Sequence, residues 1–491
     1  MVHSSRHHCP HDARKLALAR AHGRADGGRI YSITIDTPGA GTTTYTWNGV
    51  DKINLNARFS AMDIAGSAIA RHAGIPAQVA QPVQVRVNNQ NLAVVGTGMF
   101  GAYDWIEAED SDFAANHFPQ DAKGNIYRGS RRLDGVAAAT LDYVGDNPDS
   151  YRPNYSKQTN SSQDDWTDLI NLTKTFDTAQ TPDPVFVATV NQRINVTEWM
   201  RYFAVSTLLG NRETSLANGV GDDYGLYRGV IDPRFQVMIR DLDTILGQGD
   251  SGPNINESIW VGADNLPDTI GRLLKHPTFA PIYLEQLVDL INTTFSPGVL
   301  GPLLQNTLGS YVAQSTIDAM KSFAVQRNAA VLAQISQSLT ATSSLAVQNG
   351  YFRTTLATTS ALSGTADALH TRSVKVNGLP ATYTGWSGAW TAPTINLDAG
   401  INRVVVQAFD EHNQEIGRTY IDVWRDTGTT TNVSGNLAAG TTTWTPAGGP
   451  YRVTANLTVP VGATLVIQPG TTVFFDAGVR LTVNGKITAQ G

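Results

Sequence analysis

The sequence predicts an α+β domain followed by all-β modules. Up to about Thr340, apolar residues at helical spacing alternate with short strand-like segments, which is typical of a mixed α+β fold. Beyond Thr340 the chain becomes rich in Thr, Gly and Val, and short alternating segments are separated by turn residues. Near the C-terminus, apolar residues recur eight positions apart, at Leu457, Leu465, Val473 and Leu481. This repeat is typical of short-strand solenoids, so three structural regions are expected.

The totals of the chain narrow the class of protein. With 491 residues, the chain is longer than one hydrophobic core usually organises. A formal net charge of −6 argues against a nucleic-acid partner, and no apolar run is long enough to cross a membrane. The single cysteine, Cys9, excludes a disulfide framework.

The first thirty residues are basic and His-rich, without a repeating pattern. They also lack the apolar core of a signal peptide. We expect residues 1–30 to be disordered. The alternative is a metal cluster formed by His3, His7, His8, Cys9 and His11.

The α+β region begins with strands, turns and one helix. We expect strands at Tyr31–Ile35, Thr42–Trp47, Val83–Val87, Leu92–Val95 and Ala102–Ile106, a hairpin turn at Asn88–Asn91, and a helix at Ala61–His72. Gly96 to Gly101 match the pattern G-x-G-x-x-G between two expected strands. Strand–loop–strand is the setting of a kinase glycine loop, but the pattern fits a plain glycine-rich hairpin as well.

Helices dominate the rest of this region. We expect helices at Asp110–His117, Trp166–Phe176, Pro184–Ile194, Asp268–Lys275, Ile282–Ile291, Val299–Tyr311 and Thr316–Leu339, and a strand at Gly124–Gly129. The polar segment 146–163 is rich in Asn, Ser and Pro, which predicts a loop.

The stretch from Asn195 to Gly247 contains the strongest helix signal. Asn195 suits the N-cap, and Glu198 three residues later completes a capping-box pattern. Trp199, Met200, Phe203 and Thr207 recur at spacings of one to four residues, so one face of the helix is expected in the core. Gly210 and Asn211 suit its C-terminal end.

A strand pair follows the helix and leads to two aspartates. Tyr224–Arg228 and Phe235–Ile239 are predicted strands joined by a turn. In an extended backbone, residues i and i+2 point the same way, so Asp241 and Asp243 are expected to present two carboxylates to one point. Hard cations such as Mg²⁺ prefer such oxygen ligands. The alternative is a solvated loop or a helix-capping pair.

The C-terminal part predicts two all-β modules. Short strands between residues 365 and 427 indicate a sandwich of roughly immunoglobulin type. Trp386, Trp390 and Trp424 indicate either core packing there or a carbohydrate-binding strip. Residues 435–491 are typical of the first rungs of a parallel β-helix without a capping unit, so we expect the natural protein to continue.

Several ordered motifs between about Asp51 and Leu339 resemble one known family. The helix and loop NVTEWMRYFAVSTLLGN, the strand GLYR and the strand exit RDLDTILG are similar to the central block of the CotH kinase family, the spore-coat-protein-H-like atypical protein kinases. Upstream, the segment ending in Gly74-Ile75-Pro76 resembles the first helix of that family, and GAYDWIEAED and GNIYRG resemble its G-x-Y-x-x-x-E and GN-[LI]-Y-[KR] segments. The resemblance implies a kinase-like domain at about residues 31–345.

The resemblance also implies a reaction and a set of site residues. The family binds ATP with Mg²⁺ or Mn²⁺ and phosphorylates hydroxyl side chains of proteins. Asp241 matches its metal-binding Asp, Asp243 would support Asp241, and Asp223 falls near the second metal. At the position where the family has an Asp as the catalytic base, this chain has Glu213, whose side chain is one methylene longer. We therefore expect metal-dependent nucleotide binding with slow phosphate transfer. The alternative for Glu213 is a surface glutamate without a catalytic role.

Three further residues are implied for the nucleotide. Arg128 matches the basic residue of the GN-[LI]-Y-[KR] segment and is expected to reach phosphate oxygens. Glu107 matches the Glu of the G-x-Y-x-x-x-E segment and would orient Arg128, or form a purely structural ion pair with it. Lys52 is the candidate for the ATP lysine, by its place near the start of the domain.

Two other function classes fit parts of the sequence. A strand followed by Asp-x-Asp is also found in haloacid-dehalogenase-type phosphatases, but these require Thr where this chain has Ile245. A kinase-like surface protein without activity fits the appended β-modules. Those modules suggest a bacterial cell-surface or extracellular location, with a cell-surface or polysaccharide partner besides the protein substrate.

Overall fold

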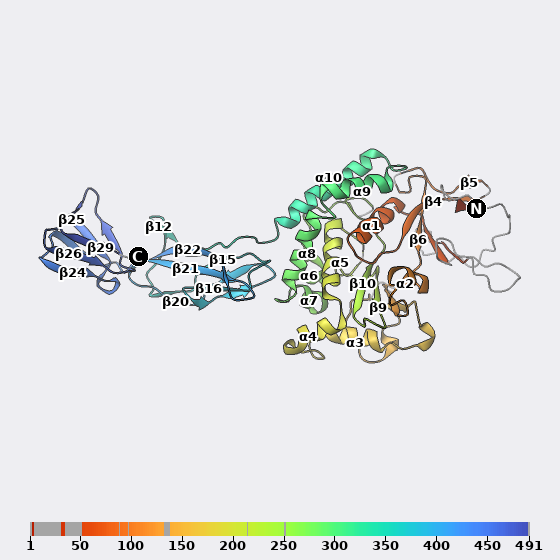
Figure 1. Ribbon diagram of the computed structural model, residues 1–491, viewed down its shortest axis with the longest axis horizontal. Helices are drawn as coiled ribbons and strands as arrows, with labels where there is room; N and C mark the ends of the chain where they lie inside the picture. Colours follow the sequence, from red (N-terminus) through yellow and green to blue (C-terminus); the bar gives the residue numbers. More distant parts are fainter. Residues whose placement is uncertain are drawn as a thin grey trace. The chain divides into compact units, whose positions relative to one another are not determined.

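The computed structural model describes residues 2–3, 31–34, 52–87, 89–96, 98–131, 138–213, 215–249 and 252–489. The chain divides into two compact units, residues 1–334 and residues 335–491. The first unit holds the long helices and two antiparallel sheets, and the second consists almost entirely of strands (Figure 1). The expected strand at Thr42–Trp47, the members of the histidine cluster other than His3, and most of the expected disordered start lie outside the described residues.

The first sheet of unit 1 is antiparallel, with the strand order β1-β4-β6-β3-β2 and β5 paired to β4. Its strands and the helix beside it are β1 (Val2–His3), β2 (Tyr31–Thr34), β3 (Lys52–Asn56), α1 (Ser60–His72), β4 (Ala80–Val87), β5 (Gln90–Asn91) and β6 (Tyr103–Glu107). The expected strand at Leu92–Val95 is wrong, because the residues after Asn91 form a loop. The amide of Phe100 donates to the carbonyl oxygen of Gly96 (2.9 Å), so the glycine motif contains a tight turn within the connection from β5 to β6.

The second sheet has the order β10-β9-β7-β8 and is antiparallel throughout. Its strands are β7 (Asn125–Gly129), β8 (Tyr155–Lys157), β9 (Tyr224–Arg228) and β10 (Phe235–Ile239). Strands β9 and β10 form the predicted hairpin with Tyr224 opposite Ile239. The residues just outside this pair, Asp223 and Arg240, therefore leave the sheet at the same end.

Helices surround the two sheets. They are α2 (Ser111–His117), α3 (Thr167–Phe176), α4 (Asp183–Arg193), α5 (Val196–Leu209), α6 (Val261–Asn265), α7 (Arg272–Leu274), α8 (Ala280–Asn292), α9 (Pro297–Leu308) and α10 (Gln314–Leu332). The helix expected over Asp268–Lys275 is instead a π-helical turn, Pro267–Gly271, followed by the short α7. The last helix ends at Leu332, earlier than the expected Leu339.

Helix α5 is the central element of the unit. It contacts α8 on one side and β10 on another, and it lies between them in Figure 1. The side chain of Asn195 accepts a hydrogen bond from the amide of Glu198, as an N-cap does, and Gly210 ends the helix with φ +59°. The prediction of one buried face was too narrow, because most of its residues are buried on several sides. Thr207 is half-buried.

The Glu198 side chain does not close the predicted capping box. Its Oε2 accepts from the amide of Val237 in β10 (2.9 Å), whereas the amide of Asn195 donates to the carbonyl oxygen of Phe235 (3.0 Å). A third hydrogen bond at the first turn of α5 runs from Nε1 of Trp199 to the carbonyl oxygen of Phe235 (2.9 Å), so three hydrogen bonds join the helix to β10. Oε1 of Glu198 has no hydrogen-bond partner among the described residues.

We expect Glu198→Gln to change how stability depends on pH. Burial raises the pKa of Glu198 from 4.5 to about 8. Between these values the unfolded chain loses the proton while the folded chain keeps it, so Glu198 lowers stability progressively as the pH rises. Gln cannot ionise, and the variant is expected to gain about 1–3 kcal/mol over the natural chain between roughly pH 5 and pH 8. Thermal unfolding across this range measures the difference, and a constant gap between the two melting temperatures would contradict the prediction.

Unit 2 begins with three small sheets. Their strands are β11 (Thr342–Ser343), β12 (Val347–Gln348), β13 (Tyr351–Thr354), β14 (Thr358–Thr359), β15 (Leu362–Thr365), β16 (Ser373–Val376), β17 (Leu379–Pro380), β18 (Thr382–Thr384), β19 (Ala389–Thr391), β20 (Ile395–Asn396), β21 (Gly400–Phe409) and β22 (Glu415–Arg425). Trp390 is 1% exposed in their common core, so a carbohydrate-binding strip that includes it is wrong. Trp424 contacts the ring of Phe474.

The last strands of unit 2 pair in parallel. The strands β23 (Thr431–Asn436), β25 (Tyr451–Val459), β27 (Val473–Phe475) and β28 (Leu481–Val483) form one sheet, and β24 (Gly440–Trp444), β26 (Ala463–Ile467) and β29 (Lys486–Ala489) form another. Leu457 lies opposite Leu481, and Leu465 lies opposite Ile487. The recurrence of eight residues therefore marks successive strands, β25 to β28, and the residues that stack are about three recurrences apart.

Candidate active site

Glu213 is placed by the loop that follows α5. Gly210 turns the chain with a left-handed backbone, and the ring of Phe323 occupies the space that a Cβ at Gly210 would need. The Asn211 side chain then accepts a hydrogen bond from the amide of Glu213 (2.9 Å), and the Asn218 side chain donates to the carbonyl oxygen of Glu213. The backbone of Glu213 is therefore held on both sides.

Asp223 and Asp241 flank the open end of the β9–β10 hairpin. Both have left-handed backbones, with φ +43° at Asp223 and +50° at Asp241. Aspartate is among the few side chains that adopt this region readily, although it costs some strain. The sequence argument of alternating side chains in an extended strand was wrong here, because the chain has left β10 before Asp241 and turns at that residue.

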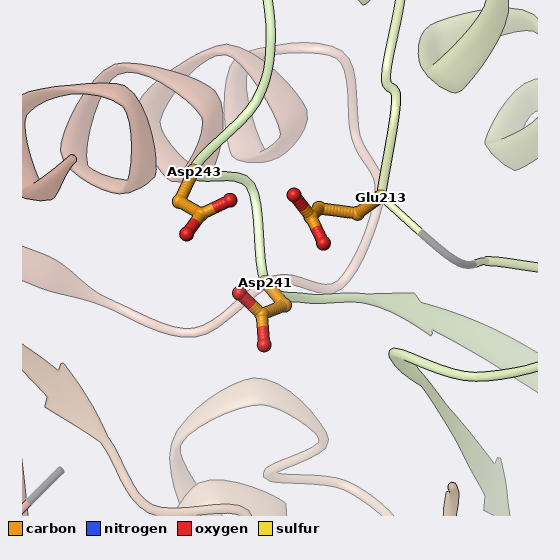
Figure 2. A group of neighbouring side chains, drawn as sticks. All are labelled: Glu213, Asp241 and Asp243. Carbon is orange, nitrogen blue, oxygen red and sulfur yellow. The ribbon is translucent and has the colours of Figure 1, made fainter. Parts of the chain in front are cut away.

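Two backbone hydrogen bonds join the loop of Glu213 to the loop of Asp243. The amide of Arg212 donates to the carbonyl oxygen of Thr244 (3.0 Å), and the amide of Leu246 donates to the carbonyl oxygen of Leu209 (2.7 Å). As a result, one carboxylate oxygen each from Glu213, Asp241 and Asp243 lie within 4.8 Å of one another. Figure 2 shows Glu213 facing Asp243, with Asp241 beside them.

Helix α1 supports this loop through Asp63. Oδ1 of Asp63 accepts a hydrogen bond from the amide of Leu242 (2.6 Å), and its Oδ2 accepts one from the Asn56 side chain (2.9 Å). A Cβ added at Gly66 would lie 2.7 Å from the Cβ of Leu242, so glycine is what lets the loop approach the helix. Asp63 thus fixes the residue between the two aspartates.

The carboxyl groups of the site are hard to ionise together. Burial raises the pKa of Glu213 to about 9, and the neighbouring Asp243 adds to the rise. The pKa values of Asp243, Asp223 and Asp63 are each raised to about 7, first by burial. For Asp223 and Asp63, the negative charge of Asp241 is the second cause of the raised pKa. Buried carboxylates at such spacing repel one another, and a bound positive charge would relieve the repulsion.

The three converging carboxylates fit a divalent cation. A hard cation takes oxygen ligands at about 2.0–2.6 Å, so ligand oxygens of one site lie within several ångströms of each other. The spacing of at most 4.8 Å between oxygens from Glu213, Asp241 and Asp243 meets this requirement. Asp243 Oδ1 also accepts a hydrogen bond from Thr244 Oγ1 (3.1 Å), which restrains its orientation.

Three further residues predicted from the sequence, Arg128, Glu107 and Lys52, are not part of the carboxylate cluster of Glu213, Asp241 and Asp243. Arg128 is half-buried in β7, and its charge acts on Asp223. Glu107 does not pair with Arg128 as predicted. Its Oε2 lies 2.7 Å from Nε2 of His117 and its Oε1 accepts from the Asn116 side chain (2.9 Å), so Glu107 connects β6 to α2. Lys52 begins β3, and its side chain lies outside the described part of the chain.

Several charged residues of the centre were not predicted. Asp63 and Asp104 are almost completely buried near Asp241, and burial raises the pKa of Asp104 well above its ordinary value. Arg240 and Glu109 form a buried ion pair at the end of β10. Two signals in the sequence point to members of this group. Asp63 interrupts the apolar stripe of a helix, and Arg240 directly follows an apolar strand.

A separate polar cavity of about 200 Å³ lies at the opposite end of β9 and β10. It is lined by side chains that include Arg193, Arg228, Asp165 and Asp168. Since Arg228 and Phe235 are at the turn end of the hairpin, this cavity is not part of the carboxylate centre.

Comparison with known proteins gives one family. Residues 29–331, more than half of the chain, match the family model described as CotH kinase protein. Among solved structures, the Helicobacter pylori protein described as the proinflammatory kinase CtkA is similar at 11% sequence identity, with a TM-score of 0.31. The match covers 64% of this chain and 92% of that protein's chain, and at this TM-score we base no argument on it. No curated protein matches the chain.

Proposed function

This chain belongs to the CotH kinase family, and on this premise we propose that it transfers the γ-phosphate of ATP to hydroxyl side chains of proteins with Mg²⁺ or Mn²⁺. Residues 29–331 form its kinase-like domain. The observation that carries the proposal is the convergence of Glu213, Asp241 and Asp243 on one point, from two loops tied together by backbone hydrogen bonds. A solvated loop or a capping pair would not require such a junction.

The side chains have separate roles in this proposal. Asp241 and Asp243 would hold the cation. Asp223, which precedes β9, is close enough for the charge of Asp241 to act on it, and it would support the site. Such a cation, when bound, neutralises negative charge on the phosphates. Arg128 is assigned to phosphate oxygens. Glu107 is assigned to the support of the fold, since its carboxylate is occupied by His117 and Asn116.

Glu213 is proposed as the base that accepts the proton of the substrate hydroxyl. In this structure its pKa of about 9 means that it holds its own proton at neutral pH. It acts as a base only where a nearby positive charge lowers that pKa. Its longer side chain compared with Asp is the reason to expect slow transfer, since a small misplacement of a positioned group costs about 10²-fold in rate.

Phosphotransfer by the full chain tests the proposal. We expect radiolabelled phosphate from γ-labelled ATP to appear on the chain itself or on a serine- and threonine-rich acceptor protein when Mn²⁺ or Mg²⁺ is present. Chelation of the cation with EDTA should abolish the transfer. If the chain neither binds ATP nor transfers phosphate with either cation, the kinase proposal fails, and a kinase-like surface protein without activity becomes the better explanation.

For the second unit, we propose that residues 365–427 form an immunoglobulin-like sandwich and residues 435–491 the first rungs of a β-solenoid. The parallel pairing of β23, β25 and β27 supports the solenoid. We further propose an extracellular or bacterial cell-surface location, with these modules binding a surface or polysaccharide partner. Among the described residues, no helix has the length and apolar character needed to cross a membrane.

A further inference from the structure

Arg240 has an unusual environment for an arginine. It directly follows β10 and precedes Asp241, and its side chain is only 11% exposed. Its Nε lies 3.4 Å from Oε1 of Glu109, whose side chain is 4% exposed. Gly225 of β9 lies next to Glu109, and the close neighbour that a Cβ at Gly225 would meet is the Met238 side chain.

The guanidinium group of Arg240 is charged but incompletely bonded. Burial alone would lower its pKa, but the carboxylates of Glu109, Asp223 and Asp241 outweigh burial and raise it. Neither Nε nor Nη1 has a hydrogen-bond partner among the described residues. Buried donors without partners cost free energy, and most are satisfied in folded proteins. The unused donors of Arg240 therefore indicate an acceptor that this structure does not contain.

A purely neutralising role explains less of this geometry. An arginine that serves only to balance carboxylates is expected to bond them bidentately, as Arg403 does with both oxygens of Asp422. Asp222 already accepts a hydrogen bond from the amide of Arg131 (2.9 Å).

We propose that Arg240 binds the phosphate oxygens of the nucleotide, with Glu109 as the positioning residue that holds its guanidinium group. This inference rests on the proposed phosphotransfer function. The planar guanidinium fork matches phosphate oxygens, and it supplies a fixed cation beside the carboxylates. Arg240 thereby takes the part that a lysine of the opening strands, paired with a glutamate, has in ordinary protein kinases.

Binding of nucleotides with different numbers of phosphates tests this assignment on the full chain. Affinities for ATP, ADP and adenosine are measured by calorimetry with Mn²⁺ for the natural chain, Arg240→Gln, Arg240→Lys and Glu109→Gln. We expect Arg240→Gln to weaken ATP binding by roughly 10- to 100-fold and to leave adenosine binding within about 3-fold. Arg240→Lys keeps the charge without the fork, so its ATP affinity should be intermediate. Glu109→Gln should weaken ATP binding by a smaller factor, again without an effect on adenosine.

Arg234→Gln is the matched control, because Arg234 is at the opposite end of the same hairpin in an exposed pair with Asp232. The inference is overturned if the natural chain binds ATP and Arg240→Gln binds it equally well, or loses ATP and adenosine affinity by the same factor. A poorly folded Arg240→Gln leaves Arg240→Lys to decide by the same comparison. If the natural chain binds no nucleotide with Mn²⁺ or Mg²⁺, the proposed function fails together with this inference, which is a separate and recognisable outcome.

Discussion

Replacing Asp241 by Asn is expected to reduce phosphotransfer by about 10³-fold and to remove the stabilisation of the chain by Mn²⁺. A catalytic cation contributes several kcal/mol to the stabilisation of transition-state charge, and Asn is a neutral and weaker ligand. The carboxylate of Asp241 is one of three that converge on one point, together with those of Glu213 and Asp243. Its loss therefore leaves Asp243 as the one carboxylate of this cluster that is assigned to the cation.

The same variant is expected to fold at least as well as the natural chain without metal. The charge of Asp241 contributes to the raised pKa values of Asp63, Asp223 and Asp243, so Asn removes a source of repulsion. Melting temperatures with and without Mn²⁺ measure both effects, since a ligand that binds the folded state alone raises the melting temperature. Asp232→Asn, in the exposed turn of the same hairpin, is the control. An Asp241→Asn chain that keeps its Mn²⁺-dependent shift would exclude Asp241 as a ligand.

The elements of the central stretch were predictable because their signals are local. Helix α5 begins after the predicted cap Asn195 and ends at the predicted Gly210, and β9 and β10 have the predicted bounds. Caps and periodic apolar residues act over a few positions, so the sequence alone contains the information. The role of Glu198 was not predictable in this way, because its partner Val237 is in β10, 39 residues away.

The carboxylate centre was predicted only in part, for a related reason. Asp241, Asp243 and Glu213 were found from motifs, and the structure brings all three together. Asp63 interrupts the apolar stripe of α1, but its partner Leu242 is 179 residues away, so nothing local indicates what its carboxylate binds. Its significance lies in burial and in the close approach permitted by Gly66, both of which are products of the tertiary fold.

For Glu107, a motif identified the residue but not the partners of its side chain. The family motif singles out Glu107, which is the last residue of β6, but a motif does not fix the direction of a side chain. Three donors close to it in space, from Val79, Asn116 and His117, satisfy its carboxylate. Glu109, two residues on, reaches Arg240 instead.

Glu213→Gln is expected to lower the rate of transfer by about 10²- to 10⁴-fold while ATP binding with Mn²⁺ is retained. Proton transfer by a positioned group contributes a factor of this size, and Gln has the same shape without the ability to accept the proton. The loop should keep its conformation, because Asn211 and Asn218 hold the backbone of Glu213 rather than its carboxylate. Single-turnover rates and ATP affinities, measured on the same preparation, separate the two effects.

Glu213→Asp is the informative companion to this variant. It keeps a carboxylate on the same backbone, so we expect transfer at least about 10-fold faster than in Glu213→Gln. The converging oxygens of Glu213, Asp241 and Asp243 also allow Glu213 to be a metal ligand instead of a base. In that case Glu213→Gln would weaken the Mn²⁺-dependent binding of ATP in parallel with the rate, and raising the Mn²⁺ concentration would restore much of the transfer. A base cannot be replaced by more cation, so a rate that stays low at saturating Mn²⁺ and ATP assigns Glu213 to proton transfer.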